Sequence, residues 1–77
     1  MRDKESEILA EKVIAELKRV RKDRGLSHEK LSEMTGLSRA GISFIESNKR
    51  NPTLISCLKV AKALDIDLGT LITENQK

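Results

Sequence analysis

The chain has 77 residues, one cysteine, one histidine and a formal net charge of +3 at pH 7. One cysteine excludes an intrachain disulfide, and one histidine with one cysteine in no ligand spacing cannot build a zinc site. A chain of this length is expected to form one domain whose core supplies about 3 to 5 kcal/mol of net stability, so good helix packing or a second copy must add to it.

Several classes of protein are disfavoured by what the sequence lacks. It has no signal peptide and no long apolar run, so we expect a cytoplasmic protein without membrane contact. It has no Gly-rich phosphate loop and no pair of nucleophile and base, so we expect neither enzymatic activity nor a cofactor.

The positive charge is concentrated in the middle of the chain. Residues 18–50 hold nine Lys and Arg against four Asp and Glu, a net charge of +5. Residues 1–17 carry a net −2, and residues 51–77 are neutral. A polyanion-binding surface produces this asymmetry, although a solvated basic face would do the same.

Apolar residues recur at helical spacing, and no alternating run predicts a strand. The first helix is expected at about residues 5–24, where Gly25 ends it. A short second helix is expected at about 28–35, with Ser27 as its N-cap and Gly36 as its end.

Three more helices follow in the remaining part of the chain, at about residues 39–47, 54–64 and 68–73. An N-cap residue precedes each of them: Ser38, Thr53 and Asp67. The sequence therefore predicts an all-α fold of five helices in a single domain that spans residues 1–77.

The third helix begins with Arg39, Ala40 and Gly41. A glycine inside a helix costs about 0.5 to 1 kcal/mol relative to alanine. A helix whose only role was to be stable would not begin in this way, so its first turn indicates a function.

Motifs at fixed spacing run through the middle of the chain: Gly25-Leu26-Ser27, Leu31, Gly36-Leu37-Ser38, Ile42, Ile45-Glu46, Arg50-Asn51-Pro52 and Ala61-Lys62-Ala63-Leu64. Over about residues 13–72 the chain resembles the helix-turn-helix domain shared by phage repressors, Cro proteins and many bacterial regulators. The resemblance implies that the second helix crosses the DNA backbone and the third enters the major groove with its N-terminal residues toward the bases. A narrow leading end would then explain Ala40 and Gly41.

The resemblance assigns contacts with DNA bases to exposed positions of the third helix: Arg39, Ala40, Ser43 and Phe44. Arg39 can donate two hydrogen bonds to guanine, Ser43 can bond to a donor or an acceptor edge, and Ala40 can meet a thymine methyl group. Related domains usually have a polar or basic residue in place of Phe44. Two interpretations stay open for Phe44, contact with thymine methyl groups or sugars and packing against the loop at residues 48–51.

Contacts with DNA phosphates are expected from helix N-termini and from the loop that follows the third helix. His28 stands where the family often has a glutamine that bonds to a phosphate, and an imidazole can donate in the same way. The full set of expected phosphate contacts is Ser27, His28, Ser38, Lys49, Arg50 and Asn51.

Two further pairs of charged residues have expected roles. Arg21 occupies the family position that pairs with Glu46, and a bidentate bond between them would fix the third helix on the first. Glu29 and Glu33 are expected on a solvated face, but related activators use acidic residues of this helix to touch RNA polymerase.

The C-terminal region is expected to join two copies of the chain. It contains more apolar residues than a short terminal segment needs to cover itself: Ile66, Leu68, Leu71 and Ile72. In the family this region joins two subunits about a twofold axis. Ile8 and Leu9 in the first helix are an alternative contact surface. Another interpretation is that the last three apolar residues cap the core of one chain beneath the first helix, which we expect at least in part for Leu68.

These expectations lead to a sequence-specific double-stranded DNA-binding transcription regulator that acts as a homodimer on inverted-repeat operators. The stretch ISFIESNKRNPTL and the extended first helix are similar to the controller proteins of restriction–modification systems, which are small autoregulatory dimers. The alternatives are a phage-type repressor, an antitoxin or other protein-interaction module on the same fold, and an RNA-binding or coactivator-type protein.

Overall fold

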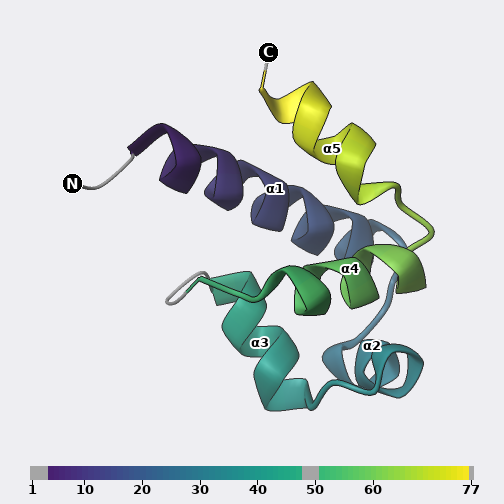
Figure 1. Cartoon of the computed structure of the whole chain (residues 1–77). Helices are drawn as coiled ribbons and strands as arrows, with labels where there is room; N and C mark the ends of the chain where they lie inside the picture. Colours follow the sequence, from purple (N-terminus) through teal and green to yellow (C-terminus); the bar gives the residue numbers. More distant parts are fainter. Residues whose placement is uncertain (1–3, 48–50, 77) are drawn as a thin grey trace.

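The computed structural model describes residues 4–47 and 51–76. Its helices are α1 (Lys4–Asp23), α2 (His28–Thr35), α3 (Arg39–Ser47), α4 (Leu54–Ala63) and α5 (Leu68–Asn75). The predicted all-α fold of five helices is confirmed, and each helix begins and ends within two residues of its expected bounds. Figure 1 shows α5 on one side of the long helix α1. The other three helices lie on the other side, with α4 between α1 and α2.

Side-chain caps and one glycine set the course of the chain through α2 and α3. The Ser27 hydroxyl accepts a hydrogen bond from the Lys30 N–H at 3.0 Å, and the Ser38 hydroxyl accepts one from the Gly41 N–H at 2.9 Å. Gly36 ends α2 with φ at 80°, a left-handed conformation that glycine adopts without a steric penalty. The turn and the two caps together aim both helix N-termini toward the same side of the molecule.

Apolar side chains from all five helices meet in one core. Its most deeply buried members are Leu31 in α2, Ile42 in α3 and Leu64 just after α4. α2 packs against α3 and α4, and α1 packs against α3 and α5. This packing holds α2 and α3 together as one unit at one end of the molecule.

An ion pair joins α1 to α3. Arg21 Nε donates to Glu46 Oε2 at 2.6 Å, and Arg21 Nη2 donates to Glu46 Oε1 at 3.0 Å. Arg21 Nη1 also donates to the backbone carbonyl of Leu26 at 2.6 Å, in the turn before α2. Each of the two paired side chains is only 9% exposed. The pair therefore connects the end of α1, the turn and the second half of α3.

Of the four apolar residues predicted to join two copies of the chain, two are used inside one chain. Leu68 and Leu71 are buried in the core, because α5 packs along α1 with these two side chains directed inward. Ile66 and Ile72 are half-buried against the same core. The C-terminal region therefore completes the fold of one chain before it can contribute to a contact between two.

Removal of the Glu46 carboxylate tests the ion pair. We expect Glu46→Ala to lower the free energy of unfolding by about 3 to 5 kcal/mol, because the Arg21 guanidinium stays buried without its partner. The double variant with Arg21→Met should recover part of this loss, though not the hydrogen bond to the Leu26 carbonyl. Urea unfolding of the parent, both single variants and the double variant measures the coupling. A Glu46→Ala protein as stable as the parent would contradict a buried pair.

Truncation in α5 tests the assignment of Leu71 to the core. We expect Leu71→Ala to lower the free energy of unfolding by about 2 to 5 kcal/mol, since it opens a cavity beneath α1. The neighbouring Ile72→Ala is the matched control and should cost less, because Ile72 is only half-buried. Thermal unfolding of the two variants compares them. Equal and small losses of unfolding free energy in the two variants would contradict the burial of Leu71.

Candidate nucleic-acid interface

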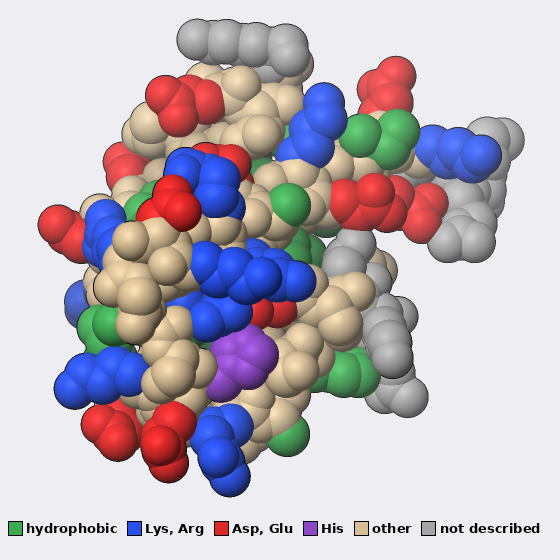
Figure 2. Space-filling model, turned by 180° about the vertical axis from the view of Figure 1, so that it is seen from behind, with side chains coloured by type: hydrophobic (Ala, Val, Ile, Leu, Met, Phe, Trp, Pro, Cys, Tyr) green, Lys and Arg blue, Asp and Glu red, His purple; other side chains and the backbone are tan. Residues whose placement is uncertain are grey.

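A concave surface lies where the N-termini of α2 and α3 meet. The residues that line it are Ser27, His28, Glu29, Ser38, Arg39, Ala40 and Ser43. Most of the residues predicted to contact DNA are in this set, so the structure brings them together from two separate helices. On this side of the molecule, Lys and Arg side chains lie above and below the single histidine (Figure 2).

The burial pattern of α3 decides which of its side chains are available to a ligand. Ile42 and Ile45 are buried in the core, so helical geometry turns Arg39, Ala40 and Ser43 outward, and all three are exposed. These three side chains occupy the leading part of the helix. α3 therefore presents a guanidinium, a methyl group and a hydroxyl at the concave surface.

The structure explains why position 41 is a glycine, for a reason that the sequence did not reveal. A Cβ atom at this position would lie 3.0 Å from the Ser38 hydroxyl oxygen, closer than such contacts normally are. That hydroxyl accepts the hydrogen bond from the Gly41 N–H and caps α3. The glycine therefore accommodates the cap of α3, in addition to leaving the helix end narrow.

Some predicted contacts remain predictions. Lys49 and Arg50 lie outside the described residues, and Asn51 is exposed just before α4. Phe44 is also exposed, but the loop against which it was expected to pack includes residues 48–50, which are not described. Both interpretations of Phe44 therefore stay open.

His28 has a partner that sequence reasoning missed. Its Nε2 lies 2.9 Å from Glu46 Oε1, so the imidazole contacts the same carboxylate that Arg21 holds. The side chain of His28 is 36% exposed, and the ring also lines the concave surface. One of the two imidazole nitrogens is therefore engaged inside the protein, and the expected contact of His28 with a phosphate stays a prediction.

The electrostatics of this cluster favour an ionised Glu46. Burial alone disfavours the charged carboxylate, but the hydrogen bonds and positive charges of Arg21 and His28 outweigh that cost and hold the pKa of Glu46 below its ordinary value of 4.5. Glu46 is therefore a hydrogen-bond acceptor for two side chains from different helices.

Of the acidic residues of α2, Glu29 lines the concave surface and Glu33 does not, and Cys57 of α4 also lies outside that lining. Glu29 and Glu33 are exposed, and Glu33 Oε1 is 3.8 Å from Lys30 Nζ. Cys57 is half-buried, and burial raises the pKa of its thiol, which makes it less reactive. Neither observation adds a chemical function to the concave surface.

A second exposed feature is apolar and lies on α4. Three side chains there, which we call the α4 patch, are exposed by 67%, 62% and 47%: Leu54, Ile55 and Leu58. Leu54 also lines an apolar groove between α1, α4 and α5, together with Leu9 and Ile72. The patch and the groove form a candidate surface for another protein chain.

No helix in residues 4–47 and 51–76 is long and apolar enough to cross a membrane.

Comparison with known proteins places the chain in a family. A family model described as helix-turn-helix matches residues 17–71. SutR, an HTH-type transcriptional regulator of Escherichia coli (strain K12), is 37% identical over 70 residues, which cover 91% of this chain and 39% of SutR. The control protein C.SmaI of Serratia marcescens is 40% identical over 67 residues, 87% of this chain and 75% of C.SmaI.

A phage protein is similar over a shorter stretch. The immunity repressor protein of Bacillus phage phi105 is 36% identical over 58 residues, 75% of this chain and 40% of the repressor. The chain thus spans less than half the length of SutR and of this repressor. No solved structure gives a significant match. The family model and these identities show that the chain belongs to the helix-turn-helix family, which confirms the resemblance to phage repressors and Cro proteins.

Proposed function

We propose that the chain is a sequence-specific double-stranded DNA-binding transcription regulator that acts as a homodimer on inverted-repeat operators. The observation that carries the proposal is the concave surface, where the N-termini of α2 and α3 bring polar and basic side chains together. In this family of folds the second helix of the motif, which corresponds to α3 here, enters the major groove with its N-terminal residues toward base edges.

The placement of Arg39 supports sequence readout. A cation at a helix N-terminus is disfavoured by the helix dipole, so Arg39 is not there to stabilise α3. Its guanidinium can donate two hydrogen bonds to O6 and N7 of a guanine, which discriminates between bases by about 1 to 3 kcal/mol. Ala40 is the next residue after Arg39, and Ser43 lies one helical turn further along α3. Both would meet neighbouring base edges.

Phosphate contacts in this proposal come from the rim of the same surface. Ser27 and Ser38 lie at the starts of α2 and α3, where backbone N–H groups are available to anions. Lys49, Arg50 and Asn51 follow α3 in the chain and are proposed to contact the DNA backbone there. Such contacts position the protein but carry no sequence information.

The similarity to C.SmaI, which is named a control protein, supports autoregulatory control of a restriction–modification operon as the finer proposal. Exposed Glu29 and Glu33 would then be available to RNA polymerase. The similarity to an immunity repressor supports a phage-type repressor as the second candidate. An antitoxin or a pure protein-interaction module would leave the grouping of Arg39 with Ser43 unexplained.

The α4 patch is the surface that we assign to the contact between two copies. Three large apolar side chains stand exposed within the first two turns of α4, whereas Leu68 and Leu71 are used inside one chain. α4 begins seven residues after α3 ends. The proposal requires a twofold contact here to hold two recognition helices about 34 Å apart, the separation of half-sites that lie one turn of DNA from each other.

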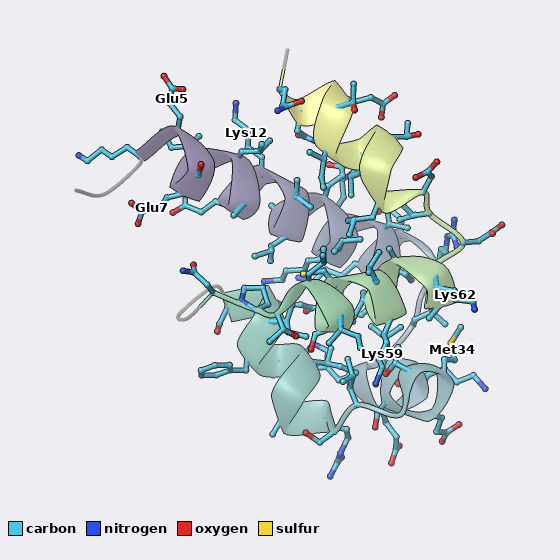
Figure 3. The ribbon with its side chains drawn as sticks, in the orientation of Figure 1. Glu5, Glu7, Lys12, Met34, Lys59 and Lys62 are labelled. Atoms are coloured by element: carbon cyan, nitrogen blue, oxygen red, sulfur yellow. The ribbon has the colours of Figure 1, made fainter. Side chains whose placement is uncertain are left out.

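Selection of bound duplexes from a random pool, followed by footprinting, tests sequence-specific binding and finds the operator. We then expect Arg39→Ala to relax the preference at one base pair of each half-site, at a cost of about 1 to 3 kcal/mol per contact. Lys12→Ala is the matched control, because it also removes one positive charge but lies on the side of α1 away from α3 (Figure 3). It should leave the preference unchanged. An equal loss across all duplexes for Arg39→Ala would contradict base readout.

Sedimentation at micromolar concentration tests the homodimer and its surface. We expect the parent to form dimers on an inverted-repeat duplex, and Ile55→Asp to weaken them while the monomer stays folded, since Ile55 is exposed. Ile8→Asp is the matched control in α1, at another exposed isoleucine. Loss of the dimer only with Ile8→Asp would move the interface to α1. A parent that stays monomeric alone and on the duplex would contradict the homodimer.

A further inference from the structure

The shared carboxylate of Glu46 determines where the proton of His28 sits. Glu46 accepts two hydrogen bonds from Arg21, and its Oε1 also faces His28 Nε2 at 2.9 Å. An ionised carboxylate can only accept, so Nε2 of His28 has to carry the N–H of this bond. The neutral imidazole has one N–H in total, and its other nitrogen, Nδ1, is therefore a lone-pair acceptor.

A DNA phosphate is also an acceptor. A phosphate therefore forms no hydrogen bond with the lone pair of a neutral His28 Nδ1, and the phosphate oxygen and this nitrogen would repel each other. The ring reaches the concave surface and its side chain is 36% exposed, so a phosphate seated there meets the imidazole. His28 can donate to Glu46 and to a phosphate at once only as the imidazolium, which has N–H groups on both nitrogens.

We propose that the chain takes up a proton at His28 when it binds DNA, so that the imidazolium bridges Glu46 and a DNA phosphate. This inference rests on the proposed function, because it needs DNA to lie against the concave surface. It adds that the affinity for DNA is linked to pH through one side chain. Histidine is the residue whose charge ordinarily changes between about pH 5 and pH 8.

The charges around His28 come from three helices. Glu46 in α3 contacts the ring, and Arg21 in α1 lies behind that carboxylate. Arg39 in α3 and Glu29 in α2 line the same concave surface. Before DNA arrives the imidazole thus contacts one carboxylate, which is shared with one guanidinium group, and another carboxylate and guanidinium group line the same surface. A phosphate adds a further negative charge on the exposed side, which favours the protonated ring.

His28→Gln is the matched variant for testing proton uptake. A glutamine amide can donate and accept hydrogen bonds at this position, but it does not change charge with pH. We expect the affinity of the parent for duplex DNA to fall about tenfold from about pH 6 to pH 8 at constant salt, because loss of one linked proton weakens binding. His28→Gln should change less than about twofold over the same range.

Two probes separate this inference from the proposed function. One is the duplex enriched by selection, and the other is an unselected duplex from the same pool. Equal pH profiles for parent and His28→Gln, at equal thermal stability, would overturn proton uptake and leave DNA binding intact. A failure of selection with the pH difference retained on the unselected duplex would support proton uptake and overturn sequence readout. No binding of either duplex at any pH would overturn both.

Nitrogen NMR of the imidazole gives a second measurement. His28 is the only histidine of the chain, so its ring signals need no assignment. We expect an N–H on Nε2 and a bare Nδ1 in the free protein at about pH 8, and N–H groups on both nitrogens in the DNA complex at about pH 7. A neutral ring in the complex, or a free protein with the proton on Nδ1, would overturn the inference.

Discussion

The fold depends on one buried carboxylate. Glu46 in α3 accepts hydrogen bonds from Arg21 in α1 and contacts His28 in α2, and Arg21 also binds the carbonyl of Leu26 between those helices. A buried charge is costly to desolvate, and it is tolerated only where its partners satisfy it in good geometry. Because these contacts reach three elements, they fix the angle between α2 and α3. The concave surface is therefore formed before any ligand binds, which reduces the ordering that binding would require.

α3 assigns different tasks to different faces within nine residues. Ile42 and Ile45 enter the core, and Glu46 holds the helix to its neighbours. The remaining face, which begins with Arg39, is free of any task in the core. Residues on this face can differ between related proteins without a cost in packing, so one scaffold can present different side chains to different ligands.

Local patterns predicted the helices well, but they could not say which face of a helix is buried. Cap residues and glycines mark helix ends because they act on the nearest backbone groups. Leu54, Leu58 and Ala61 recur at helical spacing in α4, and this spacing alone does not say which of them enters the core. The structure exposes Leu54 and Leu58 and buries Ala61. The contact of His28 with Glu46 was also invisible, since these residues are 18 positions apart and meet only through the packing of α2 on α3.

The closed core changes the reason for expecting a homodimer. For a small domain without disulfides, the sequence left good helix packing and a second copy as the two sources of further stability. Leu68 and Leu71 pack inside the core of one chain, which favours the first source. The argument for two copies therefore comes from DNA. Two half-sites on one duplex hold two monomers at a high effective concentration. Even a weak contact between the monomers then makes their binding to the two half-sites cooperative. In the homodimer that we propose, the three exposed apolar side chains of the α4 patch would supply a contact of that modest size.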